Sequence, residues 1–324
     1  MRGLGIVDFS SLFEESDRIE LEEPSGSPIG NVRALQIRPG GGFAIADEAS
    51  DQVHLYGAGG GLERTLGRPG VGPGELDGPT TAIETPDGRV YVAQRTNRRL
   101  TVYPRDGDPT LLSVPGAYGF WGSNLGDGLV LGVASPEARF AVVEYDGSVR
   151  TRFGPVDEAL DGMPFWMFLA RDHATVVDGR VVTNTSFTPT LRVFEATGDS
   201  ANSFGSAPPS WVEPMPPPAY QISGPEDPGP MGEWSKSFTV VRTIATVADQ
   251  FVVVQYGRHH PSTTDPYHVD PTTIDVYRMD GTKLAEDVVL AFPVVGGGGE
   301  LVVVTSEPSG PRTLSVYRWT GGGR

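Results

Sequence analysis

The sequence predicts an all-β protein in which one four-stranded antiparallel unit recurs along the chain. Valine-rich runs that suit strands appear at intervals, for example at 181–182, 251–254 and 301–304. The chain also carries 43 Gly and 29 Pro, so 72 of its 324 residues favour turns. Many short strands joined by turns that contain Gly and Pro are typical of an all-β domain.

The repeating unit is clearest between residues 65 and 114. Pro86, Asp87 and Gly88 form a turn signal, because proline presets φ and glycine tolerates a positive φ. The next five residues, RVYVA at 89–93, alternate like a strand with one buried face. Further turns and strands complete a meander of roughly 45 residues, which is the scale of one propeller blade.

The same pattern, followed along the chain, predicts the strands of six units. The first unit is expected at 32–37, 43–46, 52–56 and 62–66, and the second at 80–85, 89–93, 99–103 and 110–114. The third is expected at 119–125, 129–133, 140–145 and 149–153, and the fourth at 171–176, 180–183, 190–194 and 201–204. The fifth is expected at 240–247, 251–256, 273–277 and 282–288, and the sixth has three strands, at 290–295, 300–305 and 313–319.

Aromatic residues on the third strands fix the number of units. They are Tyr56, Tyr103, Tyr145, Phe194, Tyr277 and Tyr317. Their successive spacings are 47, 42, 49, 83 and 40 residues. The long interval contains a proline-rich stretch at 206–234, which we interpret as an insertion without regular structure over the mouth of the central channel. The sequence therefore predicts a six-bladed β-propeller.

The last unit lacks a fourth strand, and the N-terminal part of the chain can supply it. Residues 17–23 alternate between charged and apolar side chains but have no local partner. We expect them to pair with 313–319, because this closes the ring and removes an open sheet edge. The predicted organisation is a tail at 1–16 and one propeller domain at 17–324.

Composition excludes several classes of function and partner. The net charge is −16, from 41 acidic and 25 basic residues, which disfavours a nucleic-acid partner. The chain has no cysteine and no apolar run of about 18 residues, so neither a disulfide nor a membrane span is expected. The N-terminus lacks the pattern of a signal peptide. We expect a monomer that is secreted, periplasmic or on the cell surface with its signal removed, with a cytoplasmic location as the alternative.

Three segments of the first two units resemble a known family. They are LGRPGVGPGE at 66–75, PDGRVYVA at 86–93 and NRRL at 97–100. Together they resemble the NHL-type six-bladed β-propeller, in particular bacterial secreted or surface versions with a GxGPGE loop. Blade one has Ala46-Asp47 where the family has a strand-end Ala-Asp pair, whereas blade two has Ala93-Gln94. The family includes interaction scaffolds, RNA binders, lyases and lactonases, so the resemblance implies fold rather than activity.

Arginines at the starts of the innermost strands are the first candidates for a binding site. Arg33, Arg171 and Arg242 occupy equivalent positions when these strands are aligned on their turns. In a closed ring they would converge near the channel mouth, where guanidinium groups suit carboxylate or phosphate. The alternative is that each arginine pairs with a local acid such as Asp172, or packs between blades.

Other candidates lie in loops that share this face. Trp121 and Trp166 lie close to the innermost strands, and Arg95 and Arg98 lie between the second and third strands of blade two. Exposed aromatic and arginine side chains are common at recognition surfaces. The alternative is that the tryptophans cap the core between blades.

The sequence offers little for a metal centre or a catalytic site. A lactonase-like channel would need Glu, Asn and Asp together, but only Glu84 and Asn124 share an aligned position, near the opposite end of the channel. His259, His260 and His268 are weak metal-ligand candidates, because their spacing matches no metal motif. No cofactor is expected.

Two functions follow from these observations. The first is a non-enzymatic binding or scaffold propeller whose channel-mouth face binds an anionic small molecule or an acidic partner protein. The alternative is a propeller hydrolase or lyase, lactonase-like or NHL lyase-like, with its site at the same mouth and with a divalent metal. No serine–histidine–aspartate order or paired-carboxylate motif supports the alternative.

Overall fold

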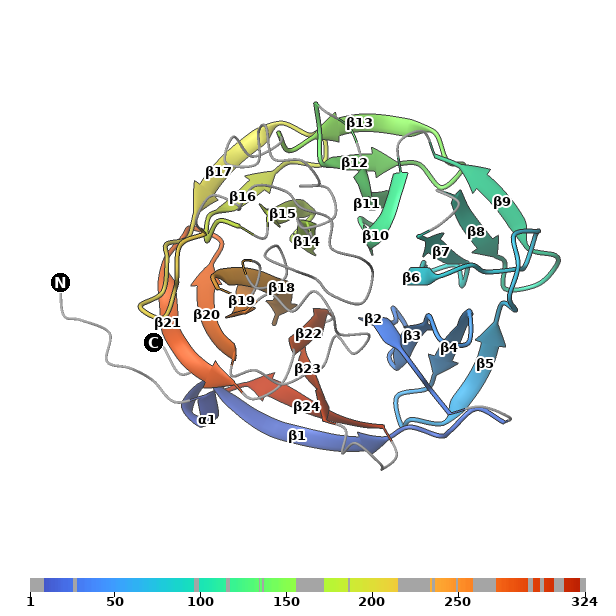
Figure 1. The fold of residues 1–324 in the computed structure, drawn as a ribbon, viewed down its shortest axis with the longest axis horizontal. Coiled ribbons are helices and arrows are strands. Elements are labelled where there is room, and N and C mark those ends of the chain that lie inside the picture. The colour runs from blue at the N-terminus through green and yellow to red at the C-terminus, as the bar shows by residue number, and fades with distance from the viewer. Residues whose placement is uncertain are drawn as a thin grey trace.

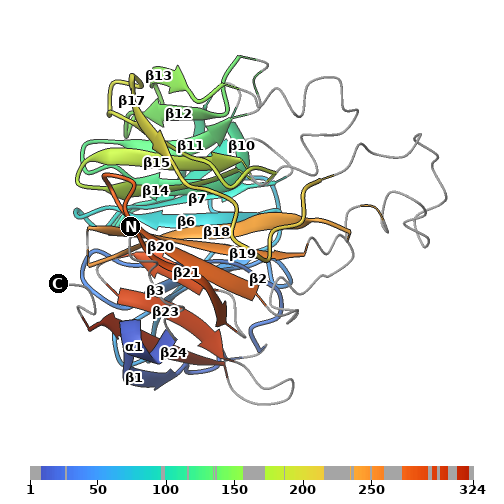
Figure 2. The ribbon, with the colours of Figure 1, turned by 90° about the vertical axis from the view of Figure 1, so that its left-hand side faces the viewer.

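Six four-stranded antiparallel sheets stand around a central axis, so the fold is a six-bladed β-propeller (Figure 1). The innermost strands β2, β6, β10, β14, β18 and β22 face the axis, and Figure 2 shows the disc from the side. This computed structural model describes residues 9–25, 28–95, 99–114, 117–133, 135, 137–155, 172–185, 187–214, 234, 237–248, 250–258, 272–290, 294–297, 300–305 and 312–320.

Each blade follows the meander that the sequence predicts. Blade one contains β2 (Val32–Ile37), β3 (Phe43–Asp47), β4 (Gln52–Tyr56) and β5 (Leu62–Leu66). Blade two contains β6 (Pro79–Glu84), β7 (Val90–Gln94), β8 (Arg99–Tyr103) and β9 (Thr110–Ser113). Blade three contains β10 (Ala117–Asn124), β11 (Leu129–Val133), β12 (Phe140–Val143) and β13 (Val149–Phe153).

The second half of the ring repeats this order. Blade four contains β14 (Asp172–Val177), β15 (Arg180–Thr185), β16 (Leu191–Phe194) and β17 (Ser200–Phe204). Blade five contains β18 (Thr239–Val247), β19 (Phe251–Arg258), β20 (Thr272–Arg278) and β21 (Lys283–Leu290). Blade six contains β22 (Val294–Gly297), β23 (Glu300–Thr305) and β24 (Thr313–Trp319), and its outer strand is β1 (Phe13–Glu20).

The position of a strand in its blade decides its burial. All five residues of β3 and of β7 are buried, because neighbouring blades cover both faces of these strands. The outer strands β5 and β13 instead alternate between exposed residues and residues that are at least partly buried. One hydrophobic cluster lies between each pair of adjacent blades, so the core is divided into six layers.

The pairing of β1 with β24 closes the ring as predicted. The two strands run antiparallel, with Phe13 opposite Trp319 and Glu20 opposite Thr313. The predicted bounds of 17–23 are wrong by three to four residues, since the strand starts at Phe13 and ends at Glu20. The ring of Phe13 contacts Trp319 edge-on at 5.3 Å between centroids, which anchors the earlier start.

Residues 9–16, which the sequence analysis assigned to a tail, therefore belong to the packed domain. The short helix α1 (Phe9–Leu12) precedes β1 and places Phe9 edge-on against Tyr317 at 5.0 Å. Leu12 and Phe13 are buried in the cluster between blades five and six. Within the described part of the chain, no helix has the length and apolar character needed to span a bilayer.

One other strand differs from its predicted range. β22 begins at Val294, whereas a start at 290 was expected. Leu290 instead ends β21 and pairs with Thr272. The last strand of blade five therefore ends two residues later than the predicted range of 282–288. All other strand bounds of the six predicted units agree with the structure within two residues.

Phe13 gives a direct test of ring closure. We expect Phe13→Ala to lower the free energy of unfolding by about 3 kcal/mol, because it removes a buried ring from the joint between the two chain ends. Urea unfolding followed by tryptophan fluorescence measures this. Arg18→Ala, an exposed position on the same strand, is the control. Equal stability of the two variants would contradict the role of β1.

Candidate functional site

The channel has two mouths, which we name by their local structure. The bulge face is the face where the innermost strands begin and where second and third strands connect. The turn face is the opposite one, where each innermost strand ends in the turn to its second strand. The sequence predicts the candidate residues on the bulge face, apart from Glu84 and Asn124 near the turn face.

Arg33 and Arg242 occupy the same structural position in two blades. Each lies at an irregularity of its innermost strand, where the register shifts between Val32 and Ala34 in blade one and between Val241 and Thr243 in blade five. Thr80 holds this position in blade two. The sequence alignment of these three residues therefore agrees with the structure.

On the bulge face, Arg33 and Arg95 meet on one carboxylate. Arg33 binds Glu48 through Nε and Nη2, and Nη1 of Arg95 lies 2.8 Å from Oε1 of Glu48. The side-chain amide of Asn31 donates to Glu48 Oε2 at 2.9 Å. The side chain of Arg95 is 48% exposed, whereas that of Glu48 is 12% exposed. Two guanidinium groups and one carboxylate give this cluster one excess positive charge.

Asp47 fixes the backbone around this cluster. Its carboxylate is fully buried and accepts hydrogen bonds from the amides of Gly30, Asn31 and Ala49 at 2.8–3.1 Å. It also accepts a hydrogen bond from the hydroxyl of Ser50 at 2.8 Å. These bonds hold both chain segments that carry Arg33 and Glu48.

Gln94 has the corresponding role in blade two. Its side-chain oxygen accepts a hydrogen bond from the amide of Asp77 at 2.8 Å, and its nitrogen donates to Thr101 at 2.6 Å. The adjacent amide of Arg95 donates to the carbonyl of Gly78 at 2.9 Å. A buried polar side chain at the end of the second strand thus orders the loop in both blades, and glutamine can replace aspartate.

The other sequence candidates on this face have different surroundings. Arg242 lies in blade five, which blade six separates from blade one, and its Nη1 donates to the carbonyl of Arg258 at 2.8 Å. Trp121 packs against the core between blades three and four, edge-on to Phe140 at 6.3 Å. Outside the described residues lie Arg98, Trp166, Arg171, His259, His260 and His268, so their roles stay predictions.

The beginning of the proline-rich stretch lies over blade five at the bulge face. The ring of Trp211 contacts Tyr256 edge-on at 5.7 Å. The amide of Val212 donates to the hydroxyl of Thr239 at 2.9 Å, and the amide of Thr239 donates to the carbonyl of Val212. Trp211 and Val212 therefore lie at the predicted face, whereas Ser206 contacts Tyr277 of β20 and Ser210 contacts Asp287 of the outer strand β21, so this part of the stretch does not lie over the channel mouth. Most of the remaining stretch lies outside the described residues.

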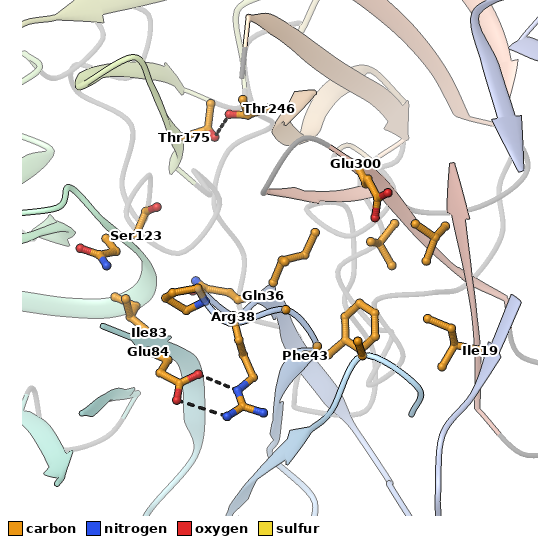
Figure 3. Close-up of a pocket in the computed structure, with 18 of the residues that line it drawn as sticks. Ile19, Gln36, Arg38, Phe43, Ile83, Glu84, Ser123, Thr175, Thr246 and Glu300 are labelled. Carbon is orange, nitrogen blue, oxygen red and sulfur yellow. Dashed lines mark hydrogen bonds and ion pairs between the residues drawn. The ribbon is translucent and has the colours of Figure 1, made fainter. Parts of the chain in front are cut away.

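A cavity of about 640 Å³ opens at the turn face and extends between blade six and blade one (Figure 3). Residues of all six blades line it, together with Ser16, Asp17 and Ile19 of the closing strand β1. One side is apolar, with Phe43 and Val302. The sequence analysis did not predict this cavity.

Arg38 is the central charged residue of the cavity wall. Its Nε lies 2.6 Å from Oε2 of Glu84, and its Nη1 lies 2.6 Å from Oε2 of Glu63. Nη1 also donates to the carbonyl of Tyr56 at 2.8 Å. The hydrogen bonds that Arg38 donates to Glu84 raise the pKa of Arg38 above its ordinary value, despite partial burial. Here one guanidinium serves two carboxylates, the reverse of the Glu48 cluster.

Neutral hydrogen bonds connect the innermost strands around the cavity. The side-chain amide of Gln36 donates to the hydroxyl of Thr81 at 2.8 Å and to the carbonyl of Gly122 at 2.7 Å, which joins three blades. The hydroxyls of Thr175 and Thr246 are 2.6 Å apart and join blades four and five. These groups satisfy one another, so the charged residues are the stronger partners for a ligand.

Within the described residues, no three His, Asp or Glu side chains converge as a metal site would require. The three histidines that the sequence suggested are not among these residues. At the bulge face Arg33 and Arg95 are ion-paired with Glu48, and at the turn face Arg38 is ion-paired with Glu63 and Glu84.

Comparison with solved structures identifies the same fold in bacterial proteins. A Bacteroides vulgatus member of the DUF4221 family has a TM-score of 0.67 at 10% identity, over 95% of this chain and 99% of that one. A protein from Bacteroides fragilis, described as exported, has a TM-score of 0.62 at 12% identity, over 97% of both chains. Virginiamycin B lyase from Staphylococcus aureus has a TM-score of 0.53 at 11% identity, over 91% of this chain and 83% of that one.

These low identities show a shared fold and carry no information on activity. No family model matches the sequence, and a search of curated proteins also finds no match.

The Arg38 ion pairs predict a specific stability effect. Arg38→Met leaves Glu84 at the cavity wall without its main partner, so we expect a loss of about 2 kcal/mol in the free energy of unfolding. Arg68→Met is the matched control, because the Arg68–Glu75 pair is exposed and should contribute under about 1 kcal/mol. Equal losses in urea unfolding would show that the Arg38 contacts do not stabilise the turn face.

His54 predicts a pH dependence near the bulge face. It is buried, and burial lowers its pKa below 6.5 although the carboxylate of Asp47 lies 4.0 Å away. His54 therefore binds a proton more readily in the unfolded chain than in the folded protein. Protonation then favours the unfolded state, so the free energy of unfolding falls as the pH drops below about 6.5. This contribution cannot exceed about 1.4 kcal/mol per pH unit.

Urea unfolding at pH 7.5 and pH 5.5 tests this dependence. We expect His54→Gln to lose less stability between the two pH values than the unmodified protein. An identical loss would mean that His54 protonates equally in both states.

Proposed function

We propose that this protein is a non-enzymatic binding propeller of the NHL type that recognises an anionic group at its bulge face. The observation that carries the proposal is the convergence of Arg33 and Arg95 on Glu48. The ligand would be a small carboxylate or phosphate compound, or an acidic group of a partner protein.

The charge balance of the cluster supports an anionic ligand. Glu48 neutralises one of the two guanidinium groups, so one positive charge remains in a chain whose net charge is −16. Arg95 is half-exposed, and its guanidinium group carries five N–H donors. Its contact with Glu48 involves the Nη1 side of this group. The remaining donors can form a fork that matches a carboxylate or phosphate.

The rigid surroundings of the cluster also support recognition. Asp47 and Gln94 hold the two loops in place through buried hydrogen bonds. A site that is ordered before binding loses less conformational freedom when the ligand arrives. Arg171, Arg242 and Arg98 would extend the positive surface if they face the same mouth.

We propose that the protein acts as a monomer outside the cytoplasm. The fold neighbour that is described as exported supports this location. The location does not affect the chemistry at Glu48.

A lyase is the second candidate function, because virginiamycin B lyase shares the fold. Such an activity would use the bulge face and residues outside the described ranges, among them His259, His260 and His268. Metal analysis of the purified protein separates the two functions, since a tightly bound stoichiometric ion would favour the enzyme.

Substitutions of Arg95 and Glu48 should change anion binding in opposite directions, which tests the proposed site. We expect citrate or phosphate to raise the melting temperature of the unmodified protein, because a ligand that binds only the folded state stabilises it. Arg95→Ala should abolish this rise. Glu48→Gln should strengthen citrate binding in isothermal titration calorimetry, because it removes the competing carboxylate.

Arg105→Ala removes an exposed arginine of blade two away from the cluster and is the control. Binding that is unchanged in Arg95→Ala, or weaker in Glu48→Gln while the variant stays folded, would overturn the proposal. An acidic peptide in the same titrations distinguishes a partner protein from a small anion.

A further inference from the structure

We propose that the cavity at the turn face is a second binding site and takes a small organic cation, an amine with an apolar body. This ligand is opposite in charge to the one proposed for the bulge face. The two sites lie at the two ends of β2 (Val32–Ile37). Arg33 lies near its first residue at the bulge face, and Arg38 follows its last residue at the turn face.

The size of the cavity fits a small molecule. Its volume of about 640 Å³ lies within the usual range of roughly 300–1,000 Å³ for ligand pockets. The walls come from the ends of the innermost strands and from β1, so a bound molecule would contact both chain ends.

The charge of the walls decides the class of ligand. Three carboxylates line the cavity, from Asp17, Glu84 and Glu300, and two guanidinium groups oppose them, from Arg38 and Arg318. The lining therefore has an excess of one negative charge, and Glu63 engages Arg38 from outside the cavity. An anion would have to compete with two carboxylates for Arg38, which disfavours it.

Glu300 is the best anchor for a cation. Both oxygens of Glu84 accept hydrogen bonds from Arg38, whereas among the described residues the carboxylate of Glu300 has a single, long contact, with Arg318 at 3.4 Å. Its side chain is 39% exposed and lies on the side of the cavity that carries Phe43 and Ile19 (Figure 3). An ammonium group at Glu300 would form a charge-assisted hydrogen bond.

The apolar wall explains why the cation should carry a hydrocarbon body. Phe43 and Ile19 line the cavity on the side of Glu300 (Figure 3), and the lining residues Val302 and Val316 belong to the same hydrophobic cluster. Burial of a hydrocarbon group on this wall adds affinity roughly in proportion to the area removed from water. Metal ions and hydrophilic cations would leave this wall unused.

Titration calorimetry with three isosteric probes tests the proposal. The probes are phenethylamine, the neutral phenethyl alcohol and the anionic phenylpropionate, with isoamylamine as an aliphatic amine. We expect at least one amine to bind more tightly than about 1 mM and the anion to bind at least tenfold more weakly. The proposal is wrong if neither amine saturates, or if the anion binds as tightly as the amine.

Variants locate the binding event. Glu300→Gln should weaken amine binding about tenfold, because it removes the charge but keeps the shape. Glu137→Gln removes an exposed carboxylate of blade three and should have no effect. Asp17→Asn provides a second change in the cavity if Glu300→Gln folds poorly. Unchanged affinity in the folded cavity variants would overturn the site.

The entire test is independent of the proposed function. Arg95→Ala alters only the bulge face and should leave amine affinity unchanged. If citrate binding fails and amine binding succeeds, the function proposed for the bulge face is wrong and this inference stands.

Discussion

Closure of the ring by β1 and β24 is the interaction on which the rest of the structure depends. A blade alone cannot bury both faces of its strands, and each of the six hydrophobic clusters lies between two neighbouring blades. An open joint would expose the clusters on both sides of blade six, together with the edge of β24. Ile19 of β1 contributes to the cluster shared with blade one and also lines the cavity, so closure and cavity share residues.

The innermost strand of blade one has two chemically different ends. In blade one, Arg33 at the start of β2 shares Glu48 with Arg95, whereas Arg38 just beyond its end is shared by Glu63 and Glu84. At blade one, the cluster on the bulge face thus has more guanidinium groups than carboxylates, and the cluster on the turn face has more carboxylates than guanidinium groups. The net charge of the chain is −16, and the positive cluster at the bulge face is held in place by the contacts of Arg33 and Arg95 with Glu48.

The sequence predicted the fold well because its signals are local. Turn residues and strand alternation located the blades, and the aligned position of Arg33 and Arg242 proved to be a shared strand irregularity. Contacts between blades were harder to predict, since Arg38 and Glu84 are 46 residues apart and no spacing rule joins them. Trp121 looked like a recognition residue by type, yet its ring is partly buried against Phe140 and the cluster between blades three and four. Burial of this kind depends on the assembled ring.

The two mouths of the channel differ in the sign of their local charge at blade one. Paramagnetic relaxation of backbone amides by a cationic and an anionic nitroxide probe measures this directly. The exposed residues Ala49, beside Glu48 and Arg95, and Gly41, beside Arg38, report the two faces. Relative to the mean of all exposed amides, we expect stronger relaxation of Ala49 by the anionic probe and of Gly41 by the cationic probe. The same preference at both amides would contradict it.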